Sequence, residues 1–200
     1  MRRAEQEYLS KRHDPIWSVE LHNRRTLTVY GVSDAFVDSG ALLSRDNPQT
    51  SNELMATLEV GYLLRLTNNT RVLSERMMYV SRSGFYTSTD SPRSSSQVLA
   101  QFSRDTSAPW FTQQTQRNNP GRGIVWQTFQ HDDGDAQPQV VTASIPLDYE
   151  HYWLGVLAMD FSVRDLQTFL VSAVKEGQSG EYQLYDKQLN LLASSALLQY

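Results

Sequence analysis

The sequence predicts an α+β fold in which helices flank an antiparallel sheet. Several short segments alternate apolar and polar residues and are separated only by polar turns, as between 76–81 and 85–89 and between 124–130 and 138–146. Consecutive strands joined in this way pair antiparallel. A second pattern, apolar residues spaced three and four apart in 164–176, indicates an amphipathic helix. Hydrophobic residues make up 40% of the 200 residues, which is enough to build the core of one or two small domains.

The first quarter of the chain predicts a helix followed by an extended segment. Residues 2–13 are rich in helix formers but carry little apolar stripe, so we expect an exposed helix. Residues 16–30 place apolar side chains in alternation, which favours an extended conformation. Residues 31–52 contain two glycines and an Asn-Pro pair and are expected to form a connecting region.

A second helix is expected over 53–66, where Leu54, Leu58, Tyr62 and Leu66 recur every four residues. Thr50 and Glu53 have the spacing of a capping box at its start. The two short strands that follow, 76–81 and 85–89, flank Arg82-Ser83-Gly84 and are expected to form a hairpin.

The middle of the chain is expected to contain a loop, a short helix and three strands. The Ser-rich residues 90–109 are predicted to be a loop, and 109–119 allow a short helix with Pro109 near its start. Strands are predicted over 124–130, 138–146 and 152–163.

The helix predicted over 164–176 leads into a final strand, turn and strand. Ser162 is expected to cap this helix and Gly177 to end it. Residues 181–195 then read as the opening hairpin of a further module. Because the chain starts in a helical pattern and stops in an apolar stretch, we expect it to be a piece of a longer protein.

Composition and motifs exclude several classes of function. A net charge of −4 disfavours a nucleic-acid-binding surface, and the lack of cysteine excludes disulfides and thiolate sites. The sequence contains no HExxH pair, no Gly-x-Ser-x-Gly elbow and no P-loop, which makes a soluble hydrolase the weakest hypothesis. The loop 131–135 lacks the spacing of a calcium loop and is expected to be a solvated hairpin tip. No apolar run is long enough to span a membrane.

Asp160 stands out because it lies inside an otherwise apolar strand. Side chains alternate across a strand, so one face carries Leu154, Val156, Ala158, Asp160 and Ser162, and the other carries Leu157, Met159, Phe161 and Val163. The second face is large and apolar and should pack on a helix. The first face has small residues that leave room, and Asp160 is expected at the floor of a cleft there. Trp110, Phe111 and Trp126 are expected as its walls.

Each of these residues also has a purely structural interpretation. Asp160 can be a hydrogen-bond acceptor that holds a neighbouring loop or the start of the next helix, where a negative charge is stabilised. Trp110 and Trp126 are as readily explained as core residues. Arg82 can be a surface residue of its turn or can reach a pocket or an interface. The sequence leaves these alternatives open.

Two groups of motifs resemble known sensor domains. The first group is PWF, a Trp-containing hairpin, QVVTASIP, and WLGVLAMDFSV followed by an amphipathic helix; it looks like a double Cache, PAS-like extracellular sensor. The second is RRTLTVYGVSDAFVDSGALLSRD, ELMATLEVGYLLRL and MMYVSRSGFYTST; it closely resembles the periplasmic CHASE-group sensor of enterobacterial inner-membrane diguanylate cyclases linked to cellulose synthesis. Together the resemblance covers about residues 14 to 195.

The resemblance implies a PAS-like Cache module and a larger parent protein. It divides the chain into an N-terminal helix and connecting region (1–52), a membrane-distal Cache module (53–177) and the start of a membrane-proximal module (178–200). The parent would be a homodimer with two transmembrane helices and a cytoplasmic GGDEF domain that converts GTP to cyclic di-GMP with Mg²⁺. No GGDEF motif occurs in this chain, so the chain itself is expected to have no enzymatic activity, no cofactor and no metal site.

The resemblance also implies candidate ligand-binding residues. Double Cache sensors of amino acids hold the ligand carboxylate with an Arg-x-Trp-aromatic segment and the ligand ammonium with an aspartate on a later strand. Trp110-Phe111 and Asp160 fit this pattern, but Ala108 stands at the arginine position; Arg82 and Arg104 are alternative cations. The full candidate set is Asp160, Trp110, Phe111, Trp126, Tyr79, Arg82 and Tyr86.

Two functions follow. The first is a periplasmic module that binds a small molecule and regulates the cyclase across the inner membrane. The alternative is a module that docks a periplasmic binding protein and has no small-molecule pocket of its own.

Overall fold

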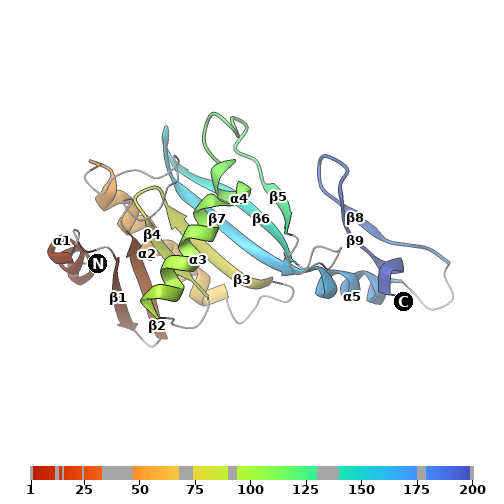
Figure 1. Ribbon diagram of the computed structural model, residues 1–200, viewed down its shortest axis with the longest axis horizontal. Helices are drawn as coiled ribbons and strands as arrows, with labels where there is room; N and C mark the ends of the chain where they lie inside the picture. The colour runs from red at the N-terminus through yellow and green to blue at the C-terminus, as the bar shows by residue number, and fades with distance from the viewer. Residues whose placement is uncertain are drawn as a thin grey trace.

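The centre of the protein is a seven-stranded antiparallel sheet with helices on both faces, in a computed structural model (Figure 1). The structure describes residues 2–11, 14, 16–23, 25–32, 47–67, 74–89, 94–129, 140–174 and 179–198. The strand order is β1-β2-β4-β3-β7-β6-β5, and every pairing is antiparallel. The α+β class predicted from the sequence is therefore confirmed.

The strands of this sheet fall close to the predicted segments. Their bounds are β1 (Ile16–Asn23), β2 (Arg25–Val32), β3 (Ser74–Ser81), β4 (Phe85–Ser88), β5 (Val125–Phe129), β6 (Val140–Tyr149) and β7 (Tyr152–Ser162). The extended segment predicted over 16–30 is a hairpin, β1 and β2, which joins the edge of the sheet beside β4. The predicted loop 131–135 lies outside the described residues.

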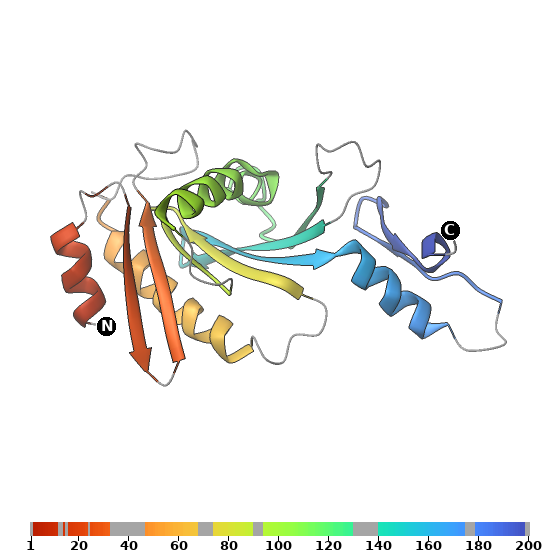
Figure 2. The same ribbon diagram turned by 60° about the horizontal axis from the view of Figure 1, so that its bottom comes forward.

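Helix α2 (Thr50–Thr67) covers one face of the sheet, below it in Figure 2. Val60 and Leu64 of α2 pack on Met77 and Tyr79, with Leu157 and Met159 of β7 at the edge of the same cluster. The prediction that the large apolar face of β7 packs on a helix is therefore confirmed.

The opposite face is covered by α3 (Ser95–Ser107) and α4 (Pro109–Thr112) (Figure 2). This face bears the small residues of β7, and side chains of both helices pack into the space that they leave. The buried cluster contains Val98, Phe102, Trp110, Phe111, Met78, Val80, Val156 and Ala158. The centre of the sheet is thus covered on both faces, and most polar groups buried there are expected to have hydrogen-bond partners within the protein.

The prediction of a loop over 90–109 is wrong for most of its length, because α3 begins at Ser95. The many serines suggested irregular structure, but Ser94 acts as the N-cap and not as a loop residue. Its backbone N–H donates to the side chain of Gln97 at 3.2 Å, and its hydroxyl accepts from the backbone N–H of Gln97, which completes a capping box. Residues 90–93 lie outside the described part of the chain.

Two smaller predictions about the N-terminal helices are also wrong. Helix α1 (Arg2–Lys11) is not wholly exposed, because Ala4 and Tyr8 are buried against Val29 and Phe85. The Thr50–Glu53 pair does not form a capping box, since the Thr50 hydroxyl donates to the Asn47 carbonyl and the Glu53 carboxylate points to the β3–β4 turn.

The C-terminal end of β7 continues directly into α5 (Val163–Ala173). Ser162 is the N-cap, as predicted, and its hydroxyl accepts from the backbone N–H of Asp165 at 3.3 Å. The predicted end at Gly177 lies outside the described residues. Helix α5 packs on β9 (Leu191–Ser194), which pairs with β8 (Gln183–Tyr185) and is followed by a 3-10 helix (Ser195–Leu198).

Candidate functional site

A row of polar side chains crosses four strands on the face covered by α3 and α4. The strand registers place Arg76 of β3 opposite Asp160 of β7, Asp160 opposite Thr142 of β6, and Thr142 opposite Gln127 of β5. Residues directly opposite one another in an antiparallel pair share a face of the sheet. We call these four residues the polar row.

Asp160 is held by its two neighbours in the polar row. Its Oδ1 accepts from the Thr142 hydroxyl at 2.6 Å, and its Oδ2 accepts from Arg76 Nε at 3.0 Å. Arg76 then reaches out of the sheet to Asp105 of α3 and donates from Nη1 and Nη2 to both carboxylate oxygens, at 3.2 and 3.0 Å. Gln101 of α3 donates to Asp105 as well, at 2.9 Å. The guanidinium therefore bridges the sheet and the helix above it.

Among the residues that the structure describes, the charges in this network do not balance. Arg76 is one cation between two carboxylates, Asp105 and Asp160, and the three side chains are only 13%, 4% and 15% exposed. Burial raises the pKa of Asp105 above its ordinary value, although Arg76 acts in the opposite direction. Burial alone would lower the pKa of Arg76, but the Asp105 carboxylate keeps it raised. A further positive group brought to this site would relieve the excess of negative charge.

Trp110 and Phe111 close the site on the α4 side. Trp110 is fixed by its backbone: its N–H donates to Gln127 Oε1 at 2.8 Å, and its carbonyl accepts from the Ser144 hydroxyl at 2.8 Å. Phe111 packs between Trp110 and Trp153, with ring centroids 6.1 and 5.7 Å away. Both rings are buried, so they occupy the space that the small residues of β7 leave.

The structure places four of the seven candidate residues on the same side of the sheet: Trp110, Phe111 and Tyr86 share one apolar cluster, and Asp160 lies on the strand face that this cluster covers. Tyr86 packs edge-on against Phe102 of α3, with ring centroids 6.1 Å apart, and acts electrostatically on Arg76. Trp126 lies on the opposite face of the sheet, because it pairs with Ala143 and contacts the Phe161 ring at 6.0 Å. Tyr79 faces α2 and Arg82 lies in the β3–β4 turn, so these three are separate from the polar row.

Tyr79 and Arg82 belong to a second buried cluster, centred on Glu53 of α2. The fully buried Glu53 carboxylate accepts from the Ser83 backbone N–H at 2.7 Å, the Ser83 hydroxyl at 2.5 Å and the Tyr152 hydroxyl at 3.0 Å. Arg82 lies over the rings of Tyr152 and Trp153, 5.5 and 5.0 Å from their centroids. The cluster fixes the start of α2 to the β3–β4 turn and to β7.

Glu53 is expected to make the stability of the fold depend on pH. Burial raises the pKa of Glu53 above its ordinary value, so between those two values the folded state binds more protons than the unfolded state. The free energy of unfolding should therefore fall as the pH rises through that window. Urea unfolding of the wild type and Glu53→Gln from pH 4.5 to 8 should show the wild type losing stability relative to the variant.

The matched control for this experiment is Glu59→Gln, which removes an exposed carboxylate from the same helix. The opposite result would be a wild type that gains stability relative to Glu53→Gln as the pH rises. It would mean that the hydrogen bonds from Ser83 and Tyr152 stabilise the ionised Glu53 carboxylate more than burial destabilises it.

Arg76 is the functional candidate that sequence reasoning missed. The cations considered were Arg82 and Arg104, but Arg104 is exposed and donates to Gln101 on its own helix, at 2.9 Å. Arg76 begins the predicted strand 76–81, in which it shares a face with Met78 and Val80, and that alternation was the signal that could have identified it. Ala108, at the expected arginine position, is buried between α3 and α4.

The described residues contain no group of three or more His, Cys, Asp or Glu side chains placed to share a metal ion. Within the same part of the chain, no helix has both the length and the apolar character needed to cross a bilayer.

A model of the CHASE7 family, described as a periplasmic sensor domain, matches residues 1–130. Solved structures with a similar arrangement include two of the sensory domain of the Campylobacter jejuni chemoreceptor Tlp3. The first matches at 17% identity and a TM-score of 0.45 over 72% of this chain and 55% of that chain. The second, in complex with L-valine, matches at 17% identity and a TM-score of 0.43, over 72% of this chain and 54% of that chain.

A third structure is the ligand-binding domain of the Pseudomonas aeruginosa amino acid chemoreceptor PctC in complex with GABA. It matches at 15% identity and a TM-score of 0.41, over 76% of this chain and 59% of that chain. The chain thus spans somewhat more than half the length of the chemoreceptor domains that it resembles. At this level of similarity the matches do not define a ligand for the present chain.

Proposed function

The chain belongs to the CHASE7 family of periplasmic sensor domains, and from this we propose that it regulates a cytoplasmic diguanylate cyclase across the inner membrane. The proposal rests on the resemblance of its hairpin and helix motifs to the sensors of enterobacterial GGDEF cyclases linked to cellulose synthesis. The GGDEF domain, with its GTP and Mg²⁺, would lie outside this chain. The parent protein is proposed to be a homodimer anchored by transmembrane helices.

We propose the division into three parts as well: the N-terminal helix and connecting region over 1–52, the distal sensing module over 53–177, and the start of a proximal module over 178–200. The boundary near residue 177 is supported by the separate two-stranded sheet of β8 and β9, whereas β1 and β2 of the first part pair into the seven-stranded sheet.

The proposed signal is a small molecule with an ammonium group, bound between the polar row and helices α3 and α4. One observation carries this proposal: among the residues that the structure describes, the buried carboxylate of Asp105 and the largely buried carboxylate of Asp160 share one guanidinium, that of Arg76. An ammonium group beside Asp160 would balance the second carboxylate and replace part of its contact with Arg76. Trp110, Phe111 and Tyr86 would then supply apolar contacts, with a rearrangement of the rings that now fill the space.

Calorimetric titration of the chain with amino acids, alkyl diamines and dicarboxylates tests this proposal. We expect heat of binding only for ligands that carry an ammonium group, and Asp160→Asn should weaken their affinity at least about tenfold, or 1.4 kcal/mol. Asp165→Asn, an exposed aspartate of α5, is the matched control and should bind like the wild type. Binding of dicarboxylates alone, or equal affinity in Asp160→Asn, would contradict the proposal.

The alternative, docking of a periplasmic binding protein, is favoured by a different observation. Helix α2 exposes three large apolar side chains on its outer side: Tyr62, Leu63 at 59% exposure and Leu66 at 70%. If a partner protein binds there, the double change Leu63→Glu and Leu66→Glu in the parent protein should abolish the change in cellular cyclic di-GMP. Asp160→Asn should then leave that response intact. The reverse result would favour the small-molecule proposal.

A further inference from the structure

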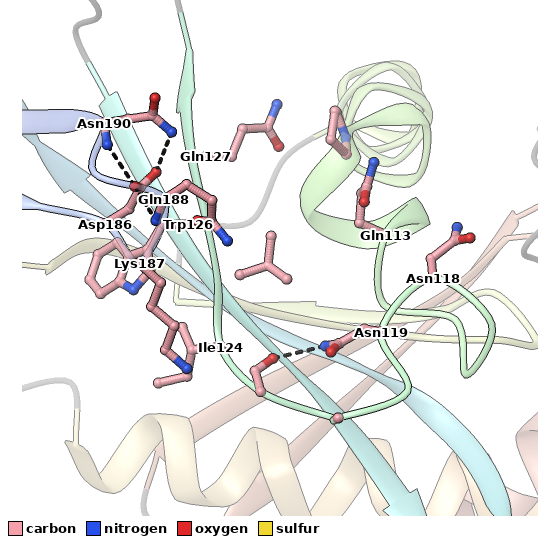
Figure 3. Close-up of a pocket in the computed structure, with 14 residues that line it drawn as sticks. Gln113, Asn118, Asn119, Ile124, Trp126, Gln127, Asp186, Lys187, Gln188 and Asn190 are labelled. Carbon is pink, nitrogen blue, oxygen red and sulfur yellow. Dashed lines mark hydrogen bonds between the residues drawn. The ribbon is translucent and has the colours of Figure 1, made fainter.

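A pocket of about 630 Å³ lies at the free edge of the sheet, along strand β5 (Figure 3). Two segments that are distant in the sequence form its walls: residues 109–127, which run from α4 into β5, and the turn between β8 and β9. Strand β5 is the last strand of the sheet order, so its outer edge makes no strand pairing within the described sheet. The pocket is separate from the Arg76–Asp160 contact, which lies two strands further into the sheet.

Carboxamide side chains dominate the lining of this pocket. Six of the fourteen lining residues are Asn or Gln: Gln113, Asn118, Asn119, Gln127, Gln188 and Asn190. All six are labelled in Figure 3 around the open centre of the pocket, and they come from both walls. A carboxamide has both a hydrogen-bond acceptor and a donor and carries no net charge.

Several of these carboxamides are held in fixed orientations by the protein. The amide nitrogens of Asn118, Asn119 and Asn190 donate to the Thr112 carbonyl, to Gly123 O at 2.8 Å, and to Asp186 Oδ2 at 2.8 Å, respectively. Their side-chain Oδ1 atoms accept no hydrogen bond from the residues that the structure describes. Gln127 is oriented the other way: its Oε1 accepts from Trp110, which leaves its NH₂ group as a donor.

The charged groups of the lining give it little net charge. Asp186 is the only acid among the fourteen residues, and its carboxylate already accepts from the backbone N–H groups of Gln188 and Asn190 and from the Asn190 side chain. Lys187 is the only base among them. Ile124, Val125, Pro109 and the indole of Trp126 add apolar surface. A ligand that fits must therefore offer many hydroxyl or N–H donors, some acceptors and no net charge.

We propose that this pocket binds an uncharged, polyhydroxylated ligand of the saccharide class. Sugar hydroxyls can donate to the fixed carbonyl oxygens of Asn118, Asn119 and Asn190 and accept from Gln127, and the C–H faces of a sugar ring suit the apolar part of the lining. This second site goes beyond the proposed ammonium sensor. Gln127 links the two, because it lines the pocket and also holds the backbone of Trp110.

The test is a titration of the chain with the neutral saccharides trehalose, cellotriose and maltotriose, monitored by calorimetry and by tryptophan fluorescence. Trigalacturonate serves as the charged comparison ligand and tri-alanine as the peptide comparison ligand. We expect at least one neutral saccharide to bind with a Kd of about 1 mM or tighter. The double variant Gln113→Ala, Gln188→Ala removes two exposed carboxamides of the lining and should weaken that binding at least about tenfold.

A control variant shows whether the saccharide binds in this pocket or elsewhere on the chain. Gln116→Ala removes a carboxamide of the same loop that does not line the pocket, and it should bind the saccharide like the wild type. No binding of any neutral saccharide, undiminished binding in the double variant, or tighter binding of trigalacturonate or tri-alanine would each overturn the proposal. Loss of ammonium-ligand binding alone would affect only the proposed sensor function.

Discussion

Replacing Arg76 with alanine is expected to lower the free energy of unfolding by about 3–5 kcal/mol, because it leaves the buried carboxylate of Asp105 and the largely buried carboxylate of Asp160 without their shared cation. The bidentate contact that fixes α3 to the sheet is lost as well. Urea or thermal unfolding of the purified chain measures the effect directly, and a loss of this size is a large part of the stability of an ordinary domain.

Two further variants identify the cause. Arg104→Ala removes an exposed arginine next to Asp105 and should change the stability by no more than about 0.5 kcal/mol. Adding Asp105→Asn to Arg76→Ala removes one of the two unpaired charges and should restore part of the lost stability. If the double variant is destabilised by the sum of the two single changes, Arg76 and Asp105 are not energetically coupled.

Gly84→Ala is expected to lower the free energy of unfolding by about 2–5 kcal/mol. Gly84 has φ of +82° in the β3–β4 turn, where an L-residue is strained by about 1–2 kcal/mol. A β-carbon at this position would lie 2.2 Å from the backbone carbonyl oxygen of Val32, and overpacking of this kind costs a further ~1–3 kcal/mol. The Val32 N–H donates to the Gly84 carbonyl at 2.8 Å, so β2 and the turn cannot separate without losing that bond.

The matched control is Gly121→Ala, since a β-carbon there meets no atom within 4 Å. Its thermal unfolding midpoint should stay close to that of the wild type, whereas that of Gly84→Ala should fall by many degrees. Equal midpoints for the two variants would mean that the turn can relax away from Val32 at little cost.

Local patterns predicted most of the elements because their signals lie within a few residues. The alternation in 152–163 and the three-and-four spacing in 164–176 correspond to β7 and α5. Helix α3 was missed because its serines have weak helix propensity and because the decisive feature, the reciprocal bonding of Ser94 and Gln97, resembles a polar loop in the sequence.

The candidate site was less predictable because it depends on register between distant strands. Alternation placed Asp160 on the face of small residues, but its partner Arg76 is 84 positions away, and only the β3–β7 register joins them. The same limit applies to Trp126 and Gln127. They point to opposite faces of β5, and the sequence did not show which of those faces lies under α4.

Asp160 lies only two residues before the point at which β7 becomes α5, and no loop separates strand from helix. The 11 residues of α5 have a length of about 16 Å, because an α-helix rises about 1.5 Å per residue. A rotation at Ser162 would therefore turn the whole helix about that residue. A rotation of about 5° at Ser162 would move the far end of α5, at Ala173, by about 1.4 Å. Because no loop between β7 and α5 can absorb such a rotation, a small angular change beside the polar row would displace the end of the helix.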